Sequence, residues 1–408
     1  MLSFGLWRLQ ISNSEEYVSR AQQNRIRPVP VLAPRGKIYD REGRLIVDNY
    51  PSFSALLLRD QPRDLNADAP KIAAGLHISV EEIRDKVRRY QLAKAPTFQP
   101  IIIKGDITPD DHAFIESHRD ELPELETIMV YRRLYPKDGF MAHLIGYTGE
   151  ISEEMLNSPK YEMYDRGDIV GQSGVEQYYN DILMGKKGSR QVIVDSKGRE
   201  VVDEKLKDKK KSGDHSLNVD PAVPGQALRL TIDLDMQIAA EQALEGWKGG
   251  IVAMDPRSGE ILAMVSRPAF NPNDFAVRIS REEWSKLVND PDHPLLNRVT
   301  QAQLAPGSVF KVIMSVAGLQ EGIAGNMHVY CTGGAKFYGD FHACHGVHGL
   351  TDVAKGITQS CDTFFYTLAD RMGIEKIAKW ATALGIGKKT GVDLPNEASG
   401  TMPSEAWK

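Results

Sequence analysis

The chain has 408 residues, of which 41% are hydrophobic and 26% are charged, and its formal net charge is −5. This length predicts two or three domains with sizeable hydrophobic cores, and the composition is that of an ordinary globular protein. The acidic balance argues against a nucleic-acid-binding protein, and no segment reaches the roughly 18 apolar residues that a membrane span requires.

The first thirty residues differ in character from the rest of the chain. Residues 1–11 are apolar but few, and they lack the basic leader and small-residue cleavage site of a signal peptide. Two interpretations stay open for them: the start of a helix in a soluble protein, or the stub of a membrane anchor. A helix is expected to begin at Ser14. We assign residues 1–30 to a juxtamembrane stub and linker.

Residues 31–220 are predicted to form a first domain that mixes strands, helices and turns. Proline-rich sequence at its start forces extended chain, because proline lacks an N–H and fixes φ. Residues 38–47 resemble a β-hairpin with its turn at residues 42–43. Residues 68–120 carry helical periodicity. The polar, proline-containing segment 203–227 is expected to be the boundary before a new domain.

Residues 221–408 show a cleaner pattern, which predicts a second domain. Residues 228–232 alternate like a strand, and residues 235–244 have the pattern of a helix. Residues 250–254 and 260–265 look like two buried strands joined by a tight turn, which predicts an antiparallel hairpin. The chain after this hairpin is mostly helical and loop-like. A strand pair followed by helices predicts an α+β fold.

The candidate catalytic centre is Ser308, the only serine in the chain with a lysine three residues later. Residues 304–307 end in Pro-Gly, which interrupts regular secondary structure, and an apolar run follows Ser308. Ser308 is therefore expected at a helix N-terminus, with Lys311 one turn later on the same face. A serine hydroxyl becomes a nucleophile when a nearby base takes its proton, and a desolvated lysine is such a base. The alternative is a helix-capping serine followed by an exposed lysine.

A second serine, Ser360, is followed by Cys361 and Asp362, between helical stretches at residues 351–359 and 364–372. A serine on such a loop can pass a proton to or from a leaving amine. The triplet fits the second part of a known signature in which S-x-x-K is accompanied by S-D-N and K-T-G, with an acid here in place of Asn. A helix-capping pair explains the same triplet when it is taken alone.

The third part of that signature, K-T-G, occurs at residues 389–391 but in the wrong setting. It follows Ser360 by only 29 residues and comes after a helical stretch at residues 375–384. The chemistry needs K-T-G on a strand beside the nucleophile, where it grips the substrate carboxylate and adds an N–H to the oxyanion hole. We therefore predict that Lys389-Thr390-Gly391 is a structural loop.

Further short motifs run along the whole chain in a specific order. In the first domain they are PRGKIYDR (34–41), RLYP (133–136), AHLIGY (142–147), GQSGVE (171–176) and GKKG (185–188). In the second they are AMDPRSGEILAM (253–264), PGSVFK (306–311) and TGVDLPNE (390–397). Their order and spacing resemble those of class B penicillin-binding proteins, most of all the elongation-type penicillin-binding protein 2.

The resemblance implies a peptidoglycan D,D-transpeptidase. Ser308 would attack the penultimate D-alanine carbonyl of a peptidoglycan stem peptide, and an acceptor amine from a neighbouring stem would resolve the acyl-enzyme. β-Lactam antibiotics would acylate the same serine. Lys311 would be the base and Ser360 the proton relay, with Asp362 in the same site. The implied fold is a β-rich and helical pedestal of the dimerisation type, followed by a penicillin-binding transpeptidase domain related to serine β-lactamases.

The resemblance also implies a location and partners. The protein would sit in the cell inner membrane with its catalytic part in the periplasm, and the pedestal would contact a membrane glycosyltransferase of the elongation machinery. No catalytic cofactor and no nucleic acid are implied. The family's K-T-G strand is not found in these 408 residues, so we expect a transpeptidase domain that is incomplete at its C-terminus and does not catalyse alone.

Other functions are compatible with parts of the same pattern. A division-type transpeptidase would use the same chemistry, and a non-catalytic scaffold that regulates a glycosyltransferase would need only the pedestal. A β-lactamase or β-lactam sensor would lack a long pedestal with the motifs around Arg35 and Glu176.

A metal site is the last candidate. The three cysteines of the chain, Cys331, Cys344 and Cys361, lie in one short stretch after Ser308, together with His348. Three cysteines and one histidine suit tetrahedral zinc. A disulfide is the alternative to a metal site, because the family works in an oxidising periplasm. A third possibility is that the cysteines form neither a metal site nor a disulfide. His342 or His345 is an alternative to His348. The role would be structural, since Cys361 adjoins Ser360.

Overall fold

The computed structural model describes residues 26–59, 65–94, 100–193, 219–277 and 279–404. It divides into two compact units, Met1–Leu295 and Leu296–Lys408, and each is described by itself. The helix expected at Ser14 and most of the predicted boundary segment 203–227 lie outside the described residues. Among the helices that are described, none combines the length and the apolar character needed to cross a membrane.

A five-stranded sheet forms the centre of the first unit. Its strands are β10 (Leu228–Arg229), β2 (Ile38–Tyr39), β3 (Leu45–Leu57), β4 (Ile101–Lys104) and β5 (Leu125–Leu134). The predicted hairpin is confirmed, because β2 and β3 pair antiparallel and Asp40 Oδ1 accepts the turn N–H groups of Glu42 and Arg44. β3 runs far beyond the predicted hairpin, since its later residues pair with both β4 and β5. The tract 68–120 is helical only in part, because it contains β4.

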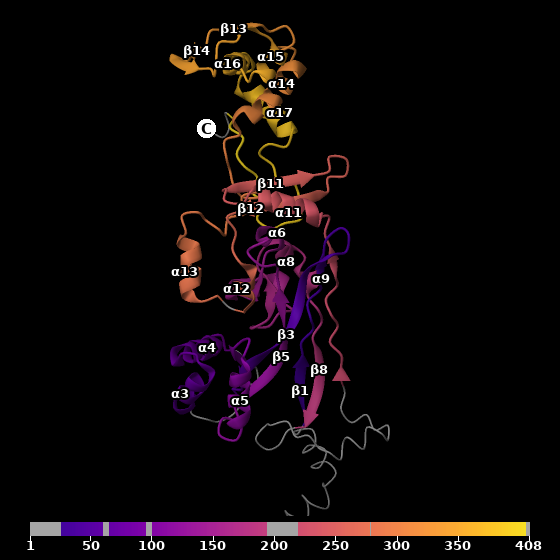
Figure 1. Cartoon of the computed structure of the whole chain (residues 1–408), viewed down its shortest axis with the longest axis vertical. Helices are drawn as coiled ribbons and strands as arrows, with labels where there is room; N and C mark the ends of the chain where they lie inside the picture. Colours follow the sequence, from indigo (N-terminus) through magenta and orange to yellow (C-terminus); the bar gives the residue numbers. More distant parts are fainter. Residues whose placement is uncertain (1–25, 60–64, 95–99, 194–218, 278, 405–408) are drawn as a thin grey trace, which may run out of the picture. The chain divides into compact units, whose positions relative to one another are not determined.

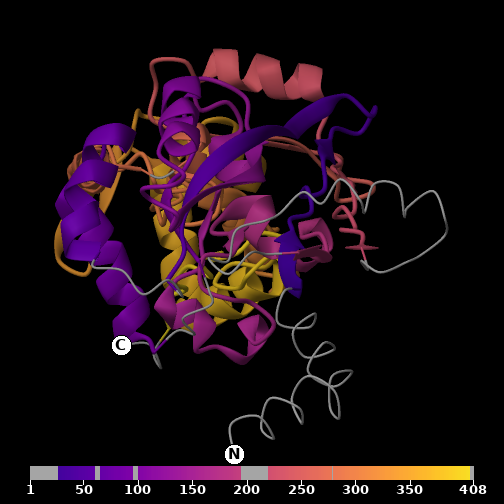
Figure 2. The same cartoon turned by 90° about the horizontal axis from the view of Figure 1, so that it is seen from below.

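Three helices cover one face of this sheet (Figure 1 and Figure 2): α3 (Leu65–Leu76), α4 (Val80–Leu92) and α5 (Pro109–Ser117). Side-chain caps begin two of them. Ser79 accepts an N–H at the start of α4, and Thr108 forms a capping box at the start of α5. The helices and the sheet enclose an aliphatic core that includes the fully buried Ile72, Ile83 and Ile103.

A second sheet joins residues that are far apart in the sequence: β1 (Ile26–Val31), β8 (Gly188–Ile193) and β9 (Val219–Asp220). Short elements connect the two sheets, namely α6 (Ala142–Ile145), β6 (Thr148–Glu150), α7 (Glu153–Leu156), η2 (Pro159–Tyr161), β7 (Ile169–Gly171), α8 (Gly174–Tyr178) and α9 (Asn180–Leu183). Two motif glycines allow them to meet closely. Gly146 and Gly174 both have positive φ, and a Cβ on Gly146 would lie 1.9 Å from the carbonyl oxygen of Ser173.

A buried ion cluster holds the pedestal motifs together. Glu176 on α8 is fully buried and accepts hydrogen bonds at 2.6 Å from Nε of Arg35 and from Nε of Arg133. Burial by itself would raise the pKa of Glu176, but the two guanidinium groups outweigh burial and hold this pKa below its ordinary value. The cluster therefore explains why the sequence carries an arginine and a glutamate in motifs 141 residues apart.

We expect Glu176→Gln to destabilise the first unit by about 3–5 kcal/mol at neutral pH, because two buried guanidinium groups lose their counter-charge. The folded-state pKa of Glu176 lies below 4.5, its ordinary value. Ionised Glu176 therefore stabilises the fold fully above that pH, and this contribution is lost as the pH falls through the folded-state pKa. Urea denaturation of wild type and variant should show a difference that shrinks towards acid pH.

The exposed Glu245 provides the control for this experiment. Glu245→Gln should change stability by less than about 0.5 kcal/mol at every pH. A Glu176→Gln effect that stayed constant from neutral to acid pH would show that the carboxylate charge is not what stabilises the cluster.

The later part of the first unit contains α11 (Leu234–Ala243), β11 (Gly249–Met254), β12 (Ile261–Arg267), α12 (Pro272–Val277) and α13 (Arg281–Asn289). The predicted hairpin is confirmed, since β11 and β12 pair antiparallel. The prediction that both strands are buried is wrong for β11, whose Val252 and Met254 are exposed. The two strands differ in packing, because β12 lies against α11 and α6 and is buried there, whereas alternate residues of β11 are exposed. The strand expected at residues 228–232 shortens to β10.

The second unit is mainly helical. Its elements are η4 (Gly307–Val309), α14 (Phe310–Gln320), β13 (Val329–Cys331), β14 (Gly334–Phe337), β15 (Asp340–Ala343), β16 (Gly349–Thr351), α15 (Val353–Thr358), α16 (Asp362–Met372) and α17 (Ile374–Ala383). The helices are close to the predicted ones. The prediction of helices and loops missed two small hairpins, β13–β16 and β14–β15. Phe364, Leu368 and Ala317 lie at the centre of the core.

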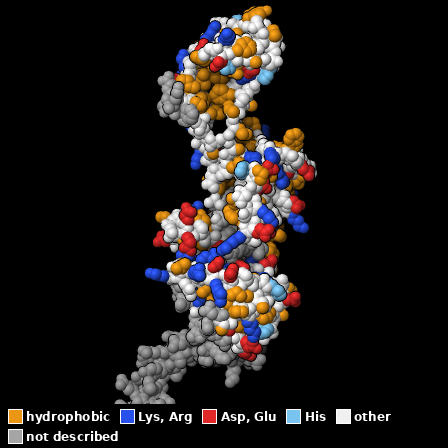
Figure 3. Space-filling view, turned by 90° about the vertical axis from the view of Figure 1, so that its left-hand side faces the viewer, with side chains coloured by type: hydrophobic (Ala, Val, Ile, Leu, Met, Phe, Trp, Pro, Cys, Tyr) orange, Lys and Arg blue, Asp and Glu red, His pale blue; other side chains and the backbone are white. Residues whose placement is uncertain are grey.

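One face of α14 is apolar and exposed. Val309, Val312, Val316 and Leu319 follow helical spacing and are between 37% and 76% exposed. The opposite face, with Met314 and Ala317, is buried in the core. Figure 3 shows hydrophobic side chains gathered on the part of the molecule formed by the second unit. An apolar stripe of this kind is typical of a contact surface. The mixture of sheets and helices in both units agrees with the predicted α+β class.

Candidate active site

Ser308 lies in the 3-10 turn η4, which continues directly into α14. Gly307 precedes it with φ +56°, a left-handed conformation that suits glycine. Ser308 is exposed to solvent. Lys311, one turn later, is half-buried. The helix-start position predicted for Ser308 is therefore close to the observed one, with a 3-10 turn in place of the first α-helical turn.

The structure brings Ser308, Lys311 and Ser360 together. Ser308 Oγ lies 2.9 Å from Ser360 Oγ. Lys311 Nζ donates to Ser360 Oγ at 2.9 Å and to the Ser360 carbonyl oxygen at 2.8 Å. Among the described hydrogen bonds of this site, Lys311 contacts Ser360 and not Ser308. The two hydroxyls and the amine thus form a chain with Ser360 in the middle.

Ser360 is held in an unusual backbone conformation. Its φ is +50°, which is uncommon for a residue with a side chain. The N–H of Ser360 donates to the carbonyl of Ile357 at 3.1 Å, and the next residue, Cys361, is the N-cap of α16. This tight connection between α15 and α16 turns the Ser360 hydroxyl towards Ser308. Residues in such strained conformations are frequent at functional sites.

Asp362 completes the cluster. Its Oδ1 accepts a hydrogen bond from Lys311 Nζ at 2.5 Å, and its Oδ2 lies 3.4 Å from Nε2 of the exposed His345. The backbone N–H of Asp362 donates to Sγ of Cys344 at 3.3 Å. The sequence indicated Asp362 through the S-x-D triplet, but it carried no signal for the contact with His345.

The loop of Lys389, Thr390 and Gly391 is held by hydrogen bonds to Glu397, a few residues later in the chain. The N–H and hydroxyl of Thr390 and the N–H of Gly391 all donate to the carboxylate of Glu397, at 2.6–3.2 Å. Burial would raise the pKa of Glu397, but these hydrogen bonds lower it. The residues form no strand, and no described contact joins them to Ser308. This is the arrangement expected of a structural loop.

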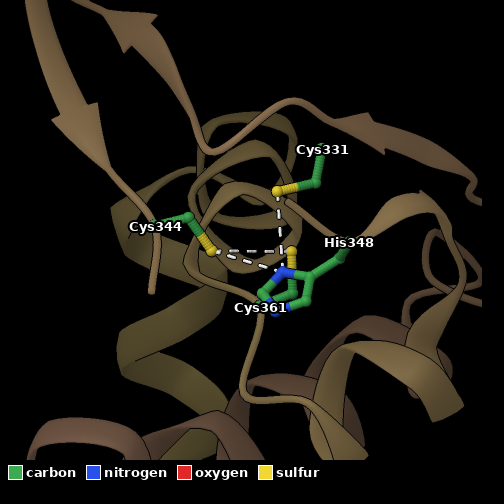
Figure 4. A group of neighbouring side chains, drawn as sticks. All are labelled: Cys331, Cys344, His348 and Cys361. Atoms are coloured by element: carbon green, nitrogen blue, oxygen red, sulfur yellow. Dashed lines mark hydrogen bonds between the residues drawn. The ribbon is translucent and has the colours of Figure 1, made fainter. Parts of the chain in front are cut away.

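The four predicted metal ligands converge (Figure 4). One ligand atom each from Cys331, Cys344, His348 and Cys361 lies within 4.8 Å of all the others. Nδ1 of His348 is 3.6 Å from Sγ of Cys331 and 3.5 Å from Sγ of Cys344. The sulfurs of Cys344 and Cys361 are 4.0 Å apart, and all three cysteines are free thiols.

This geometry suits a tetrahedral metal. In a tetrahedral zinc site with zinc–sulfur bonds of about 2.3 Å, neighbouring ligand atoms lie about 3.8 Å apart. The ligand-atom distances of 3.5–4.0 Å in this cluster are close to that value. Burial raises the pKa of Cys361 to about 11. Burial also acts on Cys331, but the Thr363 hydroxyl and backbone N–H groups lower its pKa to about 7. Thiolate is the form that binds metal, and the lowered pKa values of Cys331 and Cys344 favour that form.

The structure distinguishes between the candidate histidines. His348 points its Nδ1 at the sulfurs, as Figure 4 shows. His342 instead packs at a tilted angle against Tyr366, with ring centroids 5.4 Å apart, and His345 faces Asp362. In this structure His348, and neither His342 nor His345, lies with the three sulfurs.

Comparisons with known proteins agree with the fold. The family described as the penicillin-binding protein dimerisation domain matches residues 30–216, and the penicillin binding protein transpeptidase domain matches residues 249–408. The chain is 35% identical to peptidoglycan D,D-transpeptidase MrdA of Acinetobacter baumannii, over 98% of this chain and 58% of that protein. It is 32% identical to MrdA of Escherichia coli K12, over 100% of this chain and 64% of that protein.

Solved structures give the same result. Penicillin-binding protein 2 in complex with MreC, from Helicobacter pylori, matches with a TM-score of 0.75 and 27% identity, over 94% of this chain and 70% of that one. A component of a peptidoglycan synthase complex that coordinates polymerization and crosslinking matches with a TM-score of 0.65 and 29% identity, over 100% of this chain and 68% of that one.

The chain belongs to the penicillin-binding proteins that combine a dimerisation domain with a transpeptidase domain, a family of serine-type transpeptidases. Its relatives within that family are the penicillin-binding protein 2 and MrdA proteins, which confirms the resemblance noted in the sequence. The chain spans about three-fifths of the length of the curated relatives it matches.

Proposed function

We propose that this protein is a peptidoglycan D,D-transpeptidase of the elongation type and that Ser308 is its nucleophile. The observation that carries the proposal is the hydrogen-bonded chain from Ser308 through Ser360 to Lys311, with Asp362 beyond it. The MrdA relatives are peptidoglycan D,D-transpeptidases, which supports the same reaction here.

The reaction follows from the order of the groups. Ser308 Oγ attacks the carbonyl carbon of the penultimate D-alanine while its proton passes to Ser360 Oγ, and Ser360 passes its own proton to Lys311 Nζ, which takes part in this step as the neutral amine. The proton returns by the same route to the nitrogen of the terminal D-alanine, and the C–N bond breaks. An acceptor amine then attacks the acyl carbon, the ester bond between that carbon and Ser308 Oγ breaks, and the proton lost by the amine returns to Ser308 Oγ. Asp362 holds the Lys311 amine in place for both transfers.

Product analysis tests this function. Protein produced from its own gene is incubated with a synthetic stem pentapeptide and an acceptor amine, and mass spectrometry follows both products. We expect terminal D-alanine to be released and a cross-linked peptide to appear together. Binding of β-lactams without any release of D-alanine would favour the scaffold or sensor alternatives instead.

The four-residue cluster of Cys331, Cys344, His348 and Cys361 is, in our proposal, a structural zinc site. Zinc would be held by three thiolates and one imidazole nitrogen, with no open position for chemistry. Two contacts support a positioning role: Cys361 is the residue after Ser360, and Cys344 accepts the N–H of Asp362. Zinc would thereby fix both ends of the S-x-D triplet.

The remaining assignments rest on the domain order and the relatives. We place the pedestal at residues 31–220 and the transpeptidase domain at residues 221–408, and the family matches to residues 30–216 and 249–408 support this order of domains. The pedestal would contact a membrane glycosyltransferase, which the likeness to the peptidoglycan synthase complex supports. The location would be the periplasmic side of the cell inner membrane, where peptidoglycan is cross-linked.

A further inference from the structure

Two cysteines of the metal-binding cluster are also placed to bond with each other. Sγ of Cys344 lies 4.0 Å from Sγ of Cys361, and Figure 4 shows the two sulfurs facing one another. Cys344 directly follows β15 and Cys361 directly precedes α16, so the fold brings together thiols that are 17 residues apart in the sequence. Both are free thiols in this structure. The cluster therefore contains a preformed thiol pair.

The three thiols differ in their access to solvent and in their contacts. Cys331 and Cys361 are fully buried, whereas Cys344 is only half-buried. Cys331 donates from Sγ to the carbonyl of Gly346 at 3.5 Å and to the hydroxyl of Thr363 at 3.4 Å. A small oxidant therefore reaches Cys344 first, and Cys361 is the thiol beside it. An accessible cysteine next to a second, resolving cysteine is typical of redox-active pairs.

We propose that Cys344 and Cys361 are an oxidative modification site: when the metal is absent, hydrogen peroxide joins them in a disulfide that slows the acylation of Ser308. The effect on acylation rests on the function proposed above for Ser308, whereas the disulfide itself does not.

The chemistry balances with one molecule of peroxide. The Cys344 thiolate attacks one peroxide oxygen, the O–O bond breaks, hydroxide leaves, and Cys344 becomes a sulfenic acid. The Cys361 thiolate then attacks the sulfur of Cys344, the S–O bond breaks, and a second hydroxide leaves. Two thiols thus lose two electrons and two protons, and the peroxide is reduced to two molecules of water.

The disulfide acts on the active site through two neighbouring residues. A sulfur–sulfur bond is about 2 Å long, so the two sulfurs must approach one another from their present 4.0 Å. Cys361 directly follows Ser360, and Cys344 Sγ accepts the N–H of Asp362 at 3.3 Å. Ser360 and Asp362 are the residues that hold the Lys311 amine. Movement of the sulfurs therefore disturbs the proton chain that serves Ser308.

Zinc and the disulfide exclude each other, because they use the same sulfurs. A tetrahedral site needs all three thiolates together with His348, and the disulfide removes two of them. The metal site and the disulfide, which the sequence left open as alternatives, become two states of one cluster. Bound zinc then protects the transpeptidase site from oxidation.

Peptide mapping of the 408-residue chain tests the disulfide directly. Trypsin, which cleaves after lysine and arginine, separates the three cysteines into peptides 312–336, 337–355 and 356–371. The protein is treated with a zinc chelator and then with hydrogen peroxide, and remaining thiols are alkylated before digestion. We expect peptides 337–355 and 356–371 to be joined and Cys331 to be alkylated. The absence of joined peptides, or a join that involves 312–336, would overturn the proposal.

Two variants form a matched pair for this map. Cys331→Ser and Cys344→Ser each remove one of the four candidate metal ligands, but only Cys344→Ser removes a member of the thiol pair. After the same treatment, Cys331→Ser should still give the joined peptides and Cys344→Ser should not. The opposite pattern would contradict the assignment of the pair, and the map of the wild-type protein decides the question without either variant.

Penicillin labelling of Ser308 measures the effect on the active site. Oxidised protein should take the label about tenfold or more slowly than the chelated, reduced protein, because small displacements of catalytic groups are costly. Reduction followed by zinc should restore the rate of untreated protein, which excludes methionine oxidation as the cause. Unchanged labelling of protein that contains the disulfide would overturn the proposed effect. Untreated protein that takes no label would contradict the proposed function instead, and the peptide map would still decide whether the disulfide forms.

Discussion

Replacement of Ser308 by alanine is expected to abolish covalent labelling by a fluorescent penicillin, a loss of at least about 10³-fold in acylation rate. The label is retained only when an oxygen attacks the β-lactam carbonyl and keeps the acyl group. Ser308 Oγ is exposed and leads into the proton chain of Ser360 and Lys311. Gel fluorescence of protein produced from its own gene measures the rate.

Two further variants make this result specific. Ser360→Ala should slow labelling by about 10²–10⁴-fold, because Lys311 reaches Ser308 only through the Ser360 hydroxyl. Ser399→Ala, which removes an exposed hydroxyl bonded only to a nearby carbonyl, should label like wild type. Undiminished labelling of the Ser308→Ala protein, or a label mapped to Ser360, would mean that the nucleophile has been misassigned.

The second large effect is expected at the cysteine cluster. Purified protein should contain about one zinc per chain, and His348→Asn should reduce this content to a small fraction. Structural zinc contributes folding free energy directly, so we expect the unfolding temperature of the second unit to fall by about 5–10 °C or more. Elemental analysis and calorimetry measure the two quantities.

His342 provides a matched control for that experiment. It lies six residues before His348 but packs against Tyr366 outside the cluster, so His342→Asn should keep the zinc. The positioning role adds a further expectation: removal of zinc by a chelator should slow penicillin labelling of Ser308, because the S-x-D triplet loses its support at Cys344 and Cys361. A zinc content well below one per chain in the wild-type protein would eliminate the metal site altogether.

The candidate nucleophile could be found in the sequence because its pattern is local. Ser308 and Lys311 are one helical turn apart, so their spacing in sequence sets their spacing in space. The same holds for the two confirmed hairpins, whose turns lie within a few residues of the strands they join. The prediction of a structural loop at residues 389–391 also used local information, since the sequence before it has no strand pattern.

The contacts that organise the site are not local, and the sequence did not specify them. Nothing in the spacing of Ser360 indicates that its hydroxyl stands between Ser308 and Lys311, because that depends on the left-handed backbone at Ser360 and the packing of α15 and α16. The choice of His348 over His342 depends in the same way on two short hairpins that residue patterns did not predict.

The sequence by itself determined the family and the α+β class, and it supplied a candidate nucleophile with its candidate base and a set of cysteines with one histidine that could bind a metal. Only the tertiary structure decided that Ser360 links Ser308 to Lys311 and that Glu176 joins Arg35 to Arg133. The physical reason is the range of the interactions. Helical and turn periodicities act over a few residues, whereas buried charges and hydrogen bonds are satisfied by groups that only folding brings together.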